Sequence, residues 1–196
     1  MIIGITGGTG CGKTTLLEQI EALGGLVLDC DAIYHRLLTT DRDLLAAIEA
    51  RFPGTVENGV LQRKKLGSIV FSDEAALQDL NRITHGAVKA EVLRQLEANP
   101  SLAAIDAIAL FEGGLAELCQ VTVAVTAPEE VRVARLMARD NISEEYARKR
   151  ITAQHTDGWF REKCHHILEN TGPKADFQRK CLAFLQHIGI IVGEDR

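Results

Sequence analysis

The stretch Gly7-Gly8-Thr9-Gly10-Cys11-Gly12-Lys13-Thr14 matches the pattern G-x-x-x-x-G-K-[ST] in full. It follows the β-branched run Ile2 to Thr6 and precedes the helix-forming stretch Thr14 to Leu23. A strand, a glycine-rich loop and a helix in this order are the structural context that this motif requires. The sequence therefore predicts a loop that binds the phosphates of a nucleotide.

Each part of the predicted loop has a chemical role. Glycines let backbone N–H groups turn toward a polyphosphate, and the N-terminus of the next helix favours an anion. We expect Lys13 to hold the β- and γ-phosphates of ATP and the Thr14 hydroxyl to bind Mg²⁺. A turn that only packs a helix on a sheet is the alternative, but the complete motif favours a nucleotide site. The residues expected to contact ATP are Gly8, Thr9, Gly10, Cys11, Gly12, Lys13, Thr14 and Thr15.

Composition and charge limit the class of protein. The chain has 196 residues, 46% hydrophobic and 25% charged, which suits one domain with a substantial core. Its net charge of -5 argues against a protein that binds nucleic acid or an anionic membrane. No apolar run is long enough to cross a bilayer, and Met1 to Thr6 is too short for a signal peptide. Five cysteines without a C-x-x-C pair predict neither disulfides nor a zinc site, so we expect a cytoplasmic protein.

Beyond the loop, the chain alternates between strands and helices, with a helical block in its first half. Leu26 to Leu28 is expected to form a buried strand that places Asp29 and Asp31 at its carboxyl end, where α/β sheets bind ligands. Apolar residues at helical spacing from Ile33 to Ala98 predict a helical region. Further strands are expected at Ala103 to Phe111, Val121 to Thr126 and Ile167-Leu168, and helices at Pro128 to Arg139, at Ser143 to Gln154 and from Pro173 onward.

The acids after the second strand favour phosphoryl transfer. A carboxylate near the γ-phosphate can orient an acceptor hydroxyl and take its proton, and Asp31 is the candidate base. The alternative is that Asp29 and Asp31 both cap the next helix. Cations could close over the transferred group from two helices that flank residues 140–142, although a solvated helix face is the simpler interpretation for each alone. These cations are Arg132, Arg135, Arg139, Arg148, Lys149 and Arg150.

Several separated motifs occur in the order seen in dephospho-CoA kinases, and the resemblance covers most of the chain. Thr6 to Lys13 resembles that family's loop, and Leu28 to His35 resembles its Asp-Ala-Asp segment. Leu80 to His85 is similar to its Leu-Glu-x-Ile-x-His-Pro, and Leu110-Phe111-Glu112 to the end of its Pro-Leu-Leu-Phe-Glu. The series ends with Arg135-Leu136-x-x-Arg139-Asp140, Gln154 and Asn170-Thr171-Gly172.

The resemblance implies an enzyme that uses ATP and Mg²⁺ to phosphorylate the ribose 3′-hydroxyl of dephospho-CoA, the last step of coenzyme A synthesis. By position, Asp31 becomes the base, Lys13 and Arg139 act on the phosphates, and Asn170 contacts the adenine side of ATP. The partner is a small molecule, with no nucleic acid and no membrane, and the expected state is a monomer or a weak homo-oligomer. The candidates for substrate binding are Thr6, Asp31, His85 and Glu112.

The expected architecture is an α/β, three-layer P-loop kinase fold, with a mostly parallel five-stranded sheet and helices on both faces. We expect a single domain over residues 1–196, in which residues 1–32, 101–134 and 164–196 form the core. A helical acceptor-binding subdomain is expected at about 33–100 and a helical lid at about 135–163.

The chain departs from the family pattern at three places, all outside the phosphate loop. Gly86 replaces the proline after the family's histidine, Ile108-Ala109 replaces Pro-Leu, and Cys164-His165 replaces Ala-Asp. Two other functions stay open on the sequence. One is a kinase for another small hydroxyl acceptor, such as a nucleoside, gluconate or shikimate, and the other is a nucleotide-dependent switch that binds a protein partner.

Overall fold

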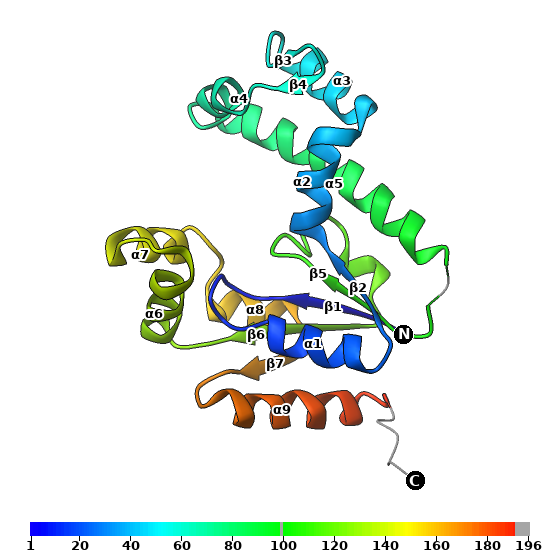
Figure 1. The fold of residues 1–196 in the computed structure, drawn as a ribbon, viewed down its shortest axis with the longest axis vertical. Coiled ribbons are helices and arrows are strands. Elements are labelled where there is room, and N and C mark those ends of the chain that lie inside the picture. Colours follow the sequence, from blue (N-terminus) through cyan, green and yellow to red (C-terminus); the bar gives the residue numbers. More distant parts are fainter. Residues whose placement is uncertain (99, 191–196) are drawn as a thin grey trace. The chain divides into compact units, whose positions relative to one another are not determined.

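The structure, a computed structural model, describes residues 1–98 and 100–190. They fall into two compact units, which are described separately. The first unit contains residues 1–27, 100–110 and 118–190, and the second contains residues 28–98 and 111–117. Figure 1 labels the elements of both. None of the helices in the described residues is long and apolar enough to cross a membrane.

The first unit is built on one sheet with the strand order β2-β5-β1-β6-β7. Its strands are β1 (Ile2–Thr6), β2 (Leu26–Asp29), β5 (Ala103–Asp106), β6 (Val121–Thr126) and β7 (His166–Glu169). Strand β1 pairs in parallel with β5 and with β6, and β6 pairs in parallel with β7. The prediction of a mostly parallel five-stranded sheet is confirmed. The order places β1, which leads into the phosphate loop, at the centre of the sheet.

Two helices cover one face of this sheet. Ile3 and Ile5 are fully buried in one core cluster together with residues of α1 (Thr14–Ala22) and α9 (Lys174–His187). These two helices contact each other and lie side by side in Figure 1. Gly4, on the other face of β1, leaves no room for a side chain, because an added Cβ would come within 2.9 Å of Leu110 Cδ2. Packing in the core therefore fixes β1 and α1, the strand and the helix that flank the loop.

The remaining helices of the first unit are α6 (Glu129–Asp140), α7 (Glu144–Thr152) and α8 (Asp157–Lys163). The first two confirm the predicted helices, and the Ser143 hydroxyl caps α7 by accepting the Tyr146 N–H, as expected. Helix α8 was not predicted as a separate helix. The sequence signal for α8 is Thr156, whose hydroxyl caps the helix by accepting the N–H of Trp159.

The second unit confirms the predicted helical block. Three of its helices begin after an aspartate whose carboxylate accepts N–H groups of the first turn: Asp29, Asp41 and Asp73. A small antiparallel hairpin lies between the second and third helices. The elements are α2 (Cys30–Thr40), α3 (Arg42–Arg51), β3 (Val56–Glu57), β4 (Val60–Leu61), α4 (Arg63–Val70) and α5 (Glu74–Leu96).

One predicted strand is shorter than expected. The apolar run from Ala103 predicted a strand to Phe111, but β5 ends at Asp106 and turns follow it, up to the 3-10 turn η1 (Ala116–Leu118). The Ala107 N–H still donates to the carbonyl of Ile5. Beyond the end of β5, the carbonyl of residue 108 accepts the hydroxyl of residue 6. The strand is therefore shorter than the apolar run that contains it.

Candidate nucleotide and acceptor sites

The loop that joins β1 to α1 leaves several backbone donors available. Lys13 already has helical backbone angles at the start of α1. Within the described residues, the N–H groups of Gly12, Lys13 and Thr14 have no hydrogen-bond acceptor. Such amides, together with the positive end of the helix dipole, form a ready site for an anion. The geometry predicted from the motif is therefore present.

Lys13 is held beside an acid that the sequence analysis missed. Its ammonium donates to the carbonyl of Gly7 at 3.2 Å and lies 3.8 Å from Asp106 Oδ1. Asp106 is the last residue of β5, after three buried apolar residues. In P-loop proteins an acid after an apolar strand helps to hold Mg²⁺. This signal was readable, but the expected strand to Phe111 placed Asp106 in the middle of an element instead of at its end.

Asn170 contacts the backbone of the phosphate loop. It follows β7 and is 4% exposed, and its amide Nδ2 donates to the carbonyl of Cys11 at 2.9 Å. Gly12 has a left-handed φ of 97°, and a Cβ there would come within 2.4 Å of Asn170 Nδ2. Glycine is therefore required at position 12. The buried Asn170 Oδ1 accepts no hydrogen bond from any described residue.

A pocket of ≈ 270 Å³ opens beside the start of α1. It brings together loop residues and Asn170, which the sequence linked only through the family resemblance. Thr14 is exposed, and its hydroxyl makes no hydrogen bond within the described residues. The pocket is lined by Gly12, Thr14, Thr15, Glu18, Arg135, Asn170, Lys174 and Phe177.

Two of the predicted lid arginines contact the loop itself. Arg132 Nε donates to the carbonyl of Thr9 at 2.9 Å, and Arg135 Nη1 donates to the carbonyls of Gly10 and Cys11 at 3.2 Å each. Sequence alone did not show this role, because a helix pattern does not say which arginine lies against a loop. Arg139 is exposed and forms a two-pronged ion pair with its neighbour, residue 140. Its predicted contact with phosphate stays a prediction.

The thiol inside the loop is not exposed. Cys11 is 1% exposed, and burial raises the pKa of its thiol. A neutral, buried thiol behaves as a small apolar side chain and not as a nucleophile. Cys11 therefore contributes to the loop through packing and through its backbone carbonyl.

The acids that follow β2 have different roles. Asp29 Oδ1 accepts the N–H of Ala32 at 2.9 Å and caps α2. Asp31 is exposed in the first turn of α2 and makes no hydrogen bond or ion pair with any described residue. The alternative in which both acids cap the helix therefore holds for Asp29 only. The side chain of Asp31 is available to a ligand.

The other acceptor-side candidates also lie mostly in the second unit. His85 is half-buried on α5, and Glu112 is exposed in a turn. Helix α5 continues through Gly86, where a proline would remove an N–H from the helix. Thr6 belongs to the first unit, is fully buried and donates its hydroxyl to the carbonyl of Ile108 at 3.3 Å. Roles of these residues in binding an acceptor stay predictions.

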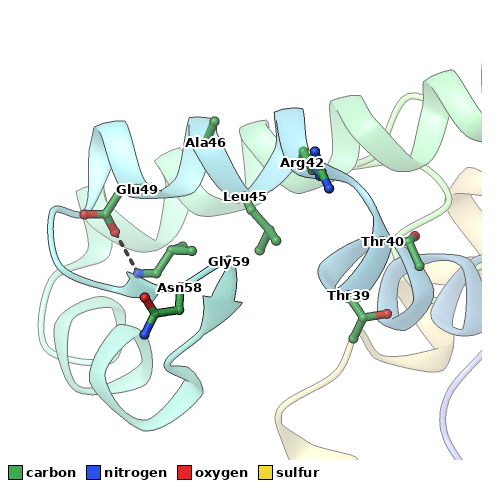
Figure 2. Close-up of a pocket in the computed structure, with 9 residues that line it drawn as sticks. Thr39, Thr40, Arg42, Leu45, Ala46, Glu49, Asn58 and Gly59 are labelled. Carbon is green, nitrogen blue, oxygen red and sulfur yellow. Dashed lines mark hydrogen bonds between the residues drawn. The ribbon is translucent and has the colours of Figure 1, made fainter.

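A larger pocket, of ≈ 760 Å³, lies within the second unit between the end of α2, helix α3 and the hairpin. Figure 2 shows Glu49 on its wall, where the carboxylate accepts the N–H of Val56 at 2.7 Å. Arg42, also on the wall, is exposed and has no ion pair with any described residue. The pocket is lined by Thr39, Thr40, Arg42, Leu45, Ala46, Glu49, Val56, Asn58 and Gly59.

A parallel sheet with a phosphate loop after its central strand, a loop lysine and a strand-end acid define a P-loop nucleotide-binding protein. A family model described as dephospho-CoA kinase matches residues 1–176. The dephospho-CoA kinase of Geobacillus kaustophilus is 33% identical over 192 residues, which cover 95% of this chain and 96% of that protein. The chain belongs to the dephospho-CoA kinase family and is an ATP-dependent kinase.

Solved structures agree with this assignment. A crystal structure of a protein from Thermus thermophilus has a TM-score of 0.79 at 34% identity and covers 96% of this chain and 97% of its own. The dephospho-CoA kinase from Campylobacter jejuni has a TM-score of 0.66 at 28% identity, covering 95% and 96%. The likeness therefore extends over the phosphate loop, the helical block and the C-terminal helices.

Proposed function

We propose that the protein transfers the γ-phosphoryl group of ATP to the ribose 3′-hydroxyl of dephospho-CoA, which gives coenzyme A. The observation that carries the proposal is the loop before α1, where Gly12, Lys13 and Thr14 have amides without acceptors in the described chain and the Lys13 ammonium is held close by. A polyphosphate is the ligand that satisfies such a set of donors. Membership of the family supports dephospho-CoA as the acceptor.

The nucleoside end of ATP would occupy the pocket of ≈ 270 Å³ beside α1. Asn170 supports this placement, because its Oδ1 is buried and accepts nothing from the described residues. A buried acceptor without a donor is unfavourable, and the amino group of adenine is a donor of suitable chemistry. Asn170 would thereby contact both the loop and the base.

The chain offers two oxygen ligands suited to Mg²⁺. Thr14 has an exposed hydroxyl at the start of α1, and Asp106 carries a carboxylate beside the loop lysine. Mg²⁺ commonly takes one or two protein oxygens together with phosphates and water, so this donor set fits the ion. When bound, the ion would neutralise charge on the β- and γ-phosphates.

We assign the proton transfer to Asp31. Its carboxylate is exposed and has no partner in the described chain, so it can accept the proton of the 3′-hydroxyl as the new O–P bond forms. Arg139 would stabilise the transferred group. Arg139 is exposed, and Asp140 also pairs with Arg150, so Asp140 keeps a cationic partner when a phosphate takes its place beside Arg139.

The helical unit would bind the rest of the acceptor. Its pocket of ≈ 760 Å³ has the size of a small-molecule site, and Arg42 supplies a cation without an ion pair in the described chain. Thr39 on the pocket wall lies about 12 Å along α2 from Asp31, given the helical rise per residue. Dephospho-CoA is an elongated molecule, so its ribose could lie at Asp31 while its pantetheine arm enters the pocket. His85 and Glu112 are further candidates in the same unit.

An acceptor panel tests the proposal. Purified protein would be given ATP and Mg²⁺ with dephospho-CoA, a nucleoside, gluconate or shikimate, and ADP release would be measured together with the mass of the product. We expect turnover with dephospho-CoA alone. Phosphorylation of another acceptor but not of dephospho-CoA would overturn the choice of substrate, and ATP binding without turnover on any acceptor would favour a switch. We further expect a cytoplasmic protein that is a monomer or a weak homo-oligomer.

A further inference from the structure

The backbone of Thr9, inside the phosphate loop, is held on both sides by side chains from outside the loop. Its N–H donates to Gln154 Oε1 at 2.8 Å, and its carbonyl oxygen accepts from Arg132 Nε at 2.9 Å. Arg132 Nη2 also donates to the same Gln154 oxygen at 3.1 Å. The three bonds form a closed set that fixes the two successive peptide groups on either side of the Thr9 Cα. Arg132 belongs to α6 and Gln154 follows α7, so later parts of the chain shape the loop.

Arg132 is also a buried cation with no anionic partner in the part of the chain that the structure describes. Its residue is 7% exposed, and it forms no ion pair with any described residue. The guanidinium packs directly on the loop, since a Cβ on Gly8 would lie only 2.1 Å from Arg132 Nη2. Its described acceptors, the Thr9 carbonyl and Gln154 Oε1, are neutral. A charge buried with neutral partners alone is strongly unfavourable, so a missing negative charge is indicated.

We propose that Arg132 is a positioning residue whose buried charge is balanced by the triphosphate of bound ATP, and that Gln154 holds it in place without neutralising it. This inference rests on the proposed nucleotide site. In this proposal only the loop backbone separates the guanidinium from the bound triphosphate. At such short range in a protein interior, a full charge contributes strongly to the affinity for ATP. A carboxylate at position 154 would have paired with Arg132 permanently and would have competed with the ligand.

A purely structural role for Arg132 requires its hydrogen bonds but not its charge. The substitution Gln154→Glu separates these two roles. It keeps an oxygen that can accept from Thr9 and from Arg132, and it places a negative charge beside the guanidinium. Gln186→Glu is the matched control, because Gln186 is exposed on α9 and the change in net charge is the same.

The experiment measures ATP affinity by calorimetry and Tm without ligand for the wild type and both variants. We expect Gln154→Glu to keep or raise the Tm while it weakens ATP binding by about tenfold or more. Gln186→Glu should match the wild type in both quantities. Wild-type ATP affinity in Gln154→Glu would overturn the inference, whereas failure of the wild type to bind ATP would overturn the proposed function instead.

A second pair of variants keeps the test decisive if Gln154→Glu folds poorly. Arg132→Lys retains the charge and loses the fork of donors, and Arg132→Gln retains a donor and loses the charge. We expect Arg132→Lys to bind ATP clearly more tightly than Arg132→Gln, by about tenfold. Equal losses of affinity in the two variants would mean that only the hydrogen bonds matter, and the charge role would be wrong.

Discussion

The two units of the molecule supply their functional groups in different ways. The first unit uses backbone amides and carbonyls of one loop, held by buried side chains such as Asn170 and Arg132. The groups that we propose for the second unit are side chains on helices, such as Asp31 and Arg42, which have no partners within the described residues. The triphosphate is the same in every nucleoside triphosphate and suits a fixed backbone site. The acceptor differs between kinases and is recognised by side chains that vary between them.

The strongest test of this contrast compares the two acids after β2. Asp31→Asn should lower turnover by about 10²- to 10⁴-fold while the Kd for ATP stays nearly unchanged, because a base acts in the transition state. Asp29→Ala should instead remove the cap of α2 and lower stability by about 0.5–2 kcal/mol, with turnover largely kept. For both variants, steady-state kinetics measure the change in turnover and thermal unfolding measures the change in stability. Unchanged turnover in Asp31→Asn would refute its assigned role.

Asp106 tests the Mg²⁺ site that we propose for the first unit. Asp106→Asn keeps the shape of the side chain but removes its charge, so we expect kcat to fall by about 10²-fold and the Mg²⁺ requirement to rise. Lys13→Ala should differ by weakening the binding of ATP itself along with the rate. A Mg²⁺ titration of activity measures the effect. An Asp106→Asn enzyme with a wild-type titration curve would exclude this residue from the metal site.

Arg42 tests the pocket in the second unit. Arg42→Gln should raise the KM for dephospho-CoA by about tenfold and leave the KM for ATP unchanged, because a charge-assisted hydrogen bond to the acceptor is lost. Lys64→Gln is the matched control, since Lys64 is exposed in the same unit, outside the pocket, and loses the same charge. If both variants raise the KM equally, the effect is general electrostatics and the pocket is not the acceptor site.

A smaller effect concerns the packing of the helical unit. Hydrogen bonds from Arg94 lower the pKa of Glu91 to about 2. Gln95 and Arg36 lower this pKa further, whereas desolvation of the carboxylate raises it. A lowered pKa in the folded state adds stability above the unfolded value of 4.5, and that stability is lost as pH falls toward about 2. Thermal unfolding between these pH values should show a steeper fall for the wild type than for Glu91→Gln. Parallel curves would contradict a stabilising role.

The sequence predicted the parts of the site whose chemistry lies in consecutive residues. The loop from Gly7 to Thr14 was readable because backbone geometry at glycines and one lysine define it. The sheet and most helices followed from apolar periodicity and from caps such as Ser143. Asp31 was proposed as the base from its place after the second strand, and Asn170 as an adenine contact from resemblance to a family; both roles stay predictions.

The parts that the sequence did not predict depend on which way a side chain faces. Arg132 and Arg135 were expected either above a transferred phosphate or on a solvated helix face. Their partners are instead loop carbonyls more than a hundred residues away in the chain. Asp106 was hidden inside an apolar run, because no glycine or proline marks the point where β5 ends. Local patterns do not contain such long-range contacts, so only the folded chain could reveal them.

The buried thiol of Cys11 has a consequence for an enzyme whose proposed product is itself a thiol. Formation of a mixed disulfide requires a thiolate that can reach the other sulfur. The raised pKa of Cys11 disfavours its thiolate, and its burial prevents contact with another sulfur. The oxidised, disulfide form of coenzyme A should therefore be unable to cap this cysteine covalently. Oxidation of the proposed product would therefore leave the phosphate loop unmodified at Cys11.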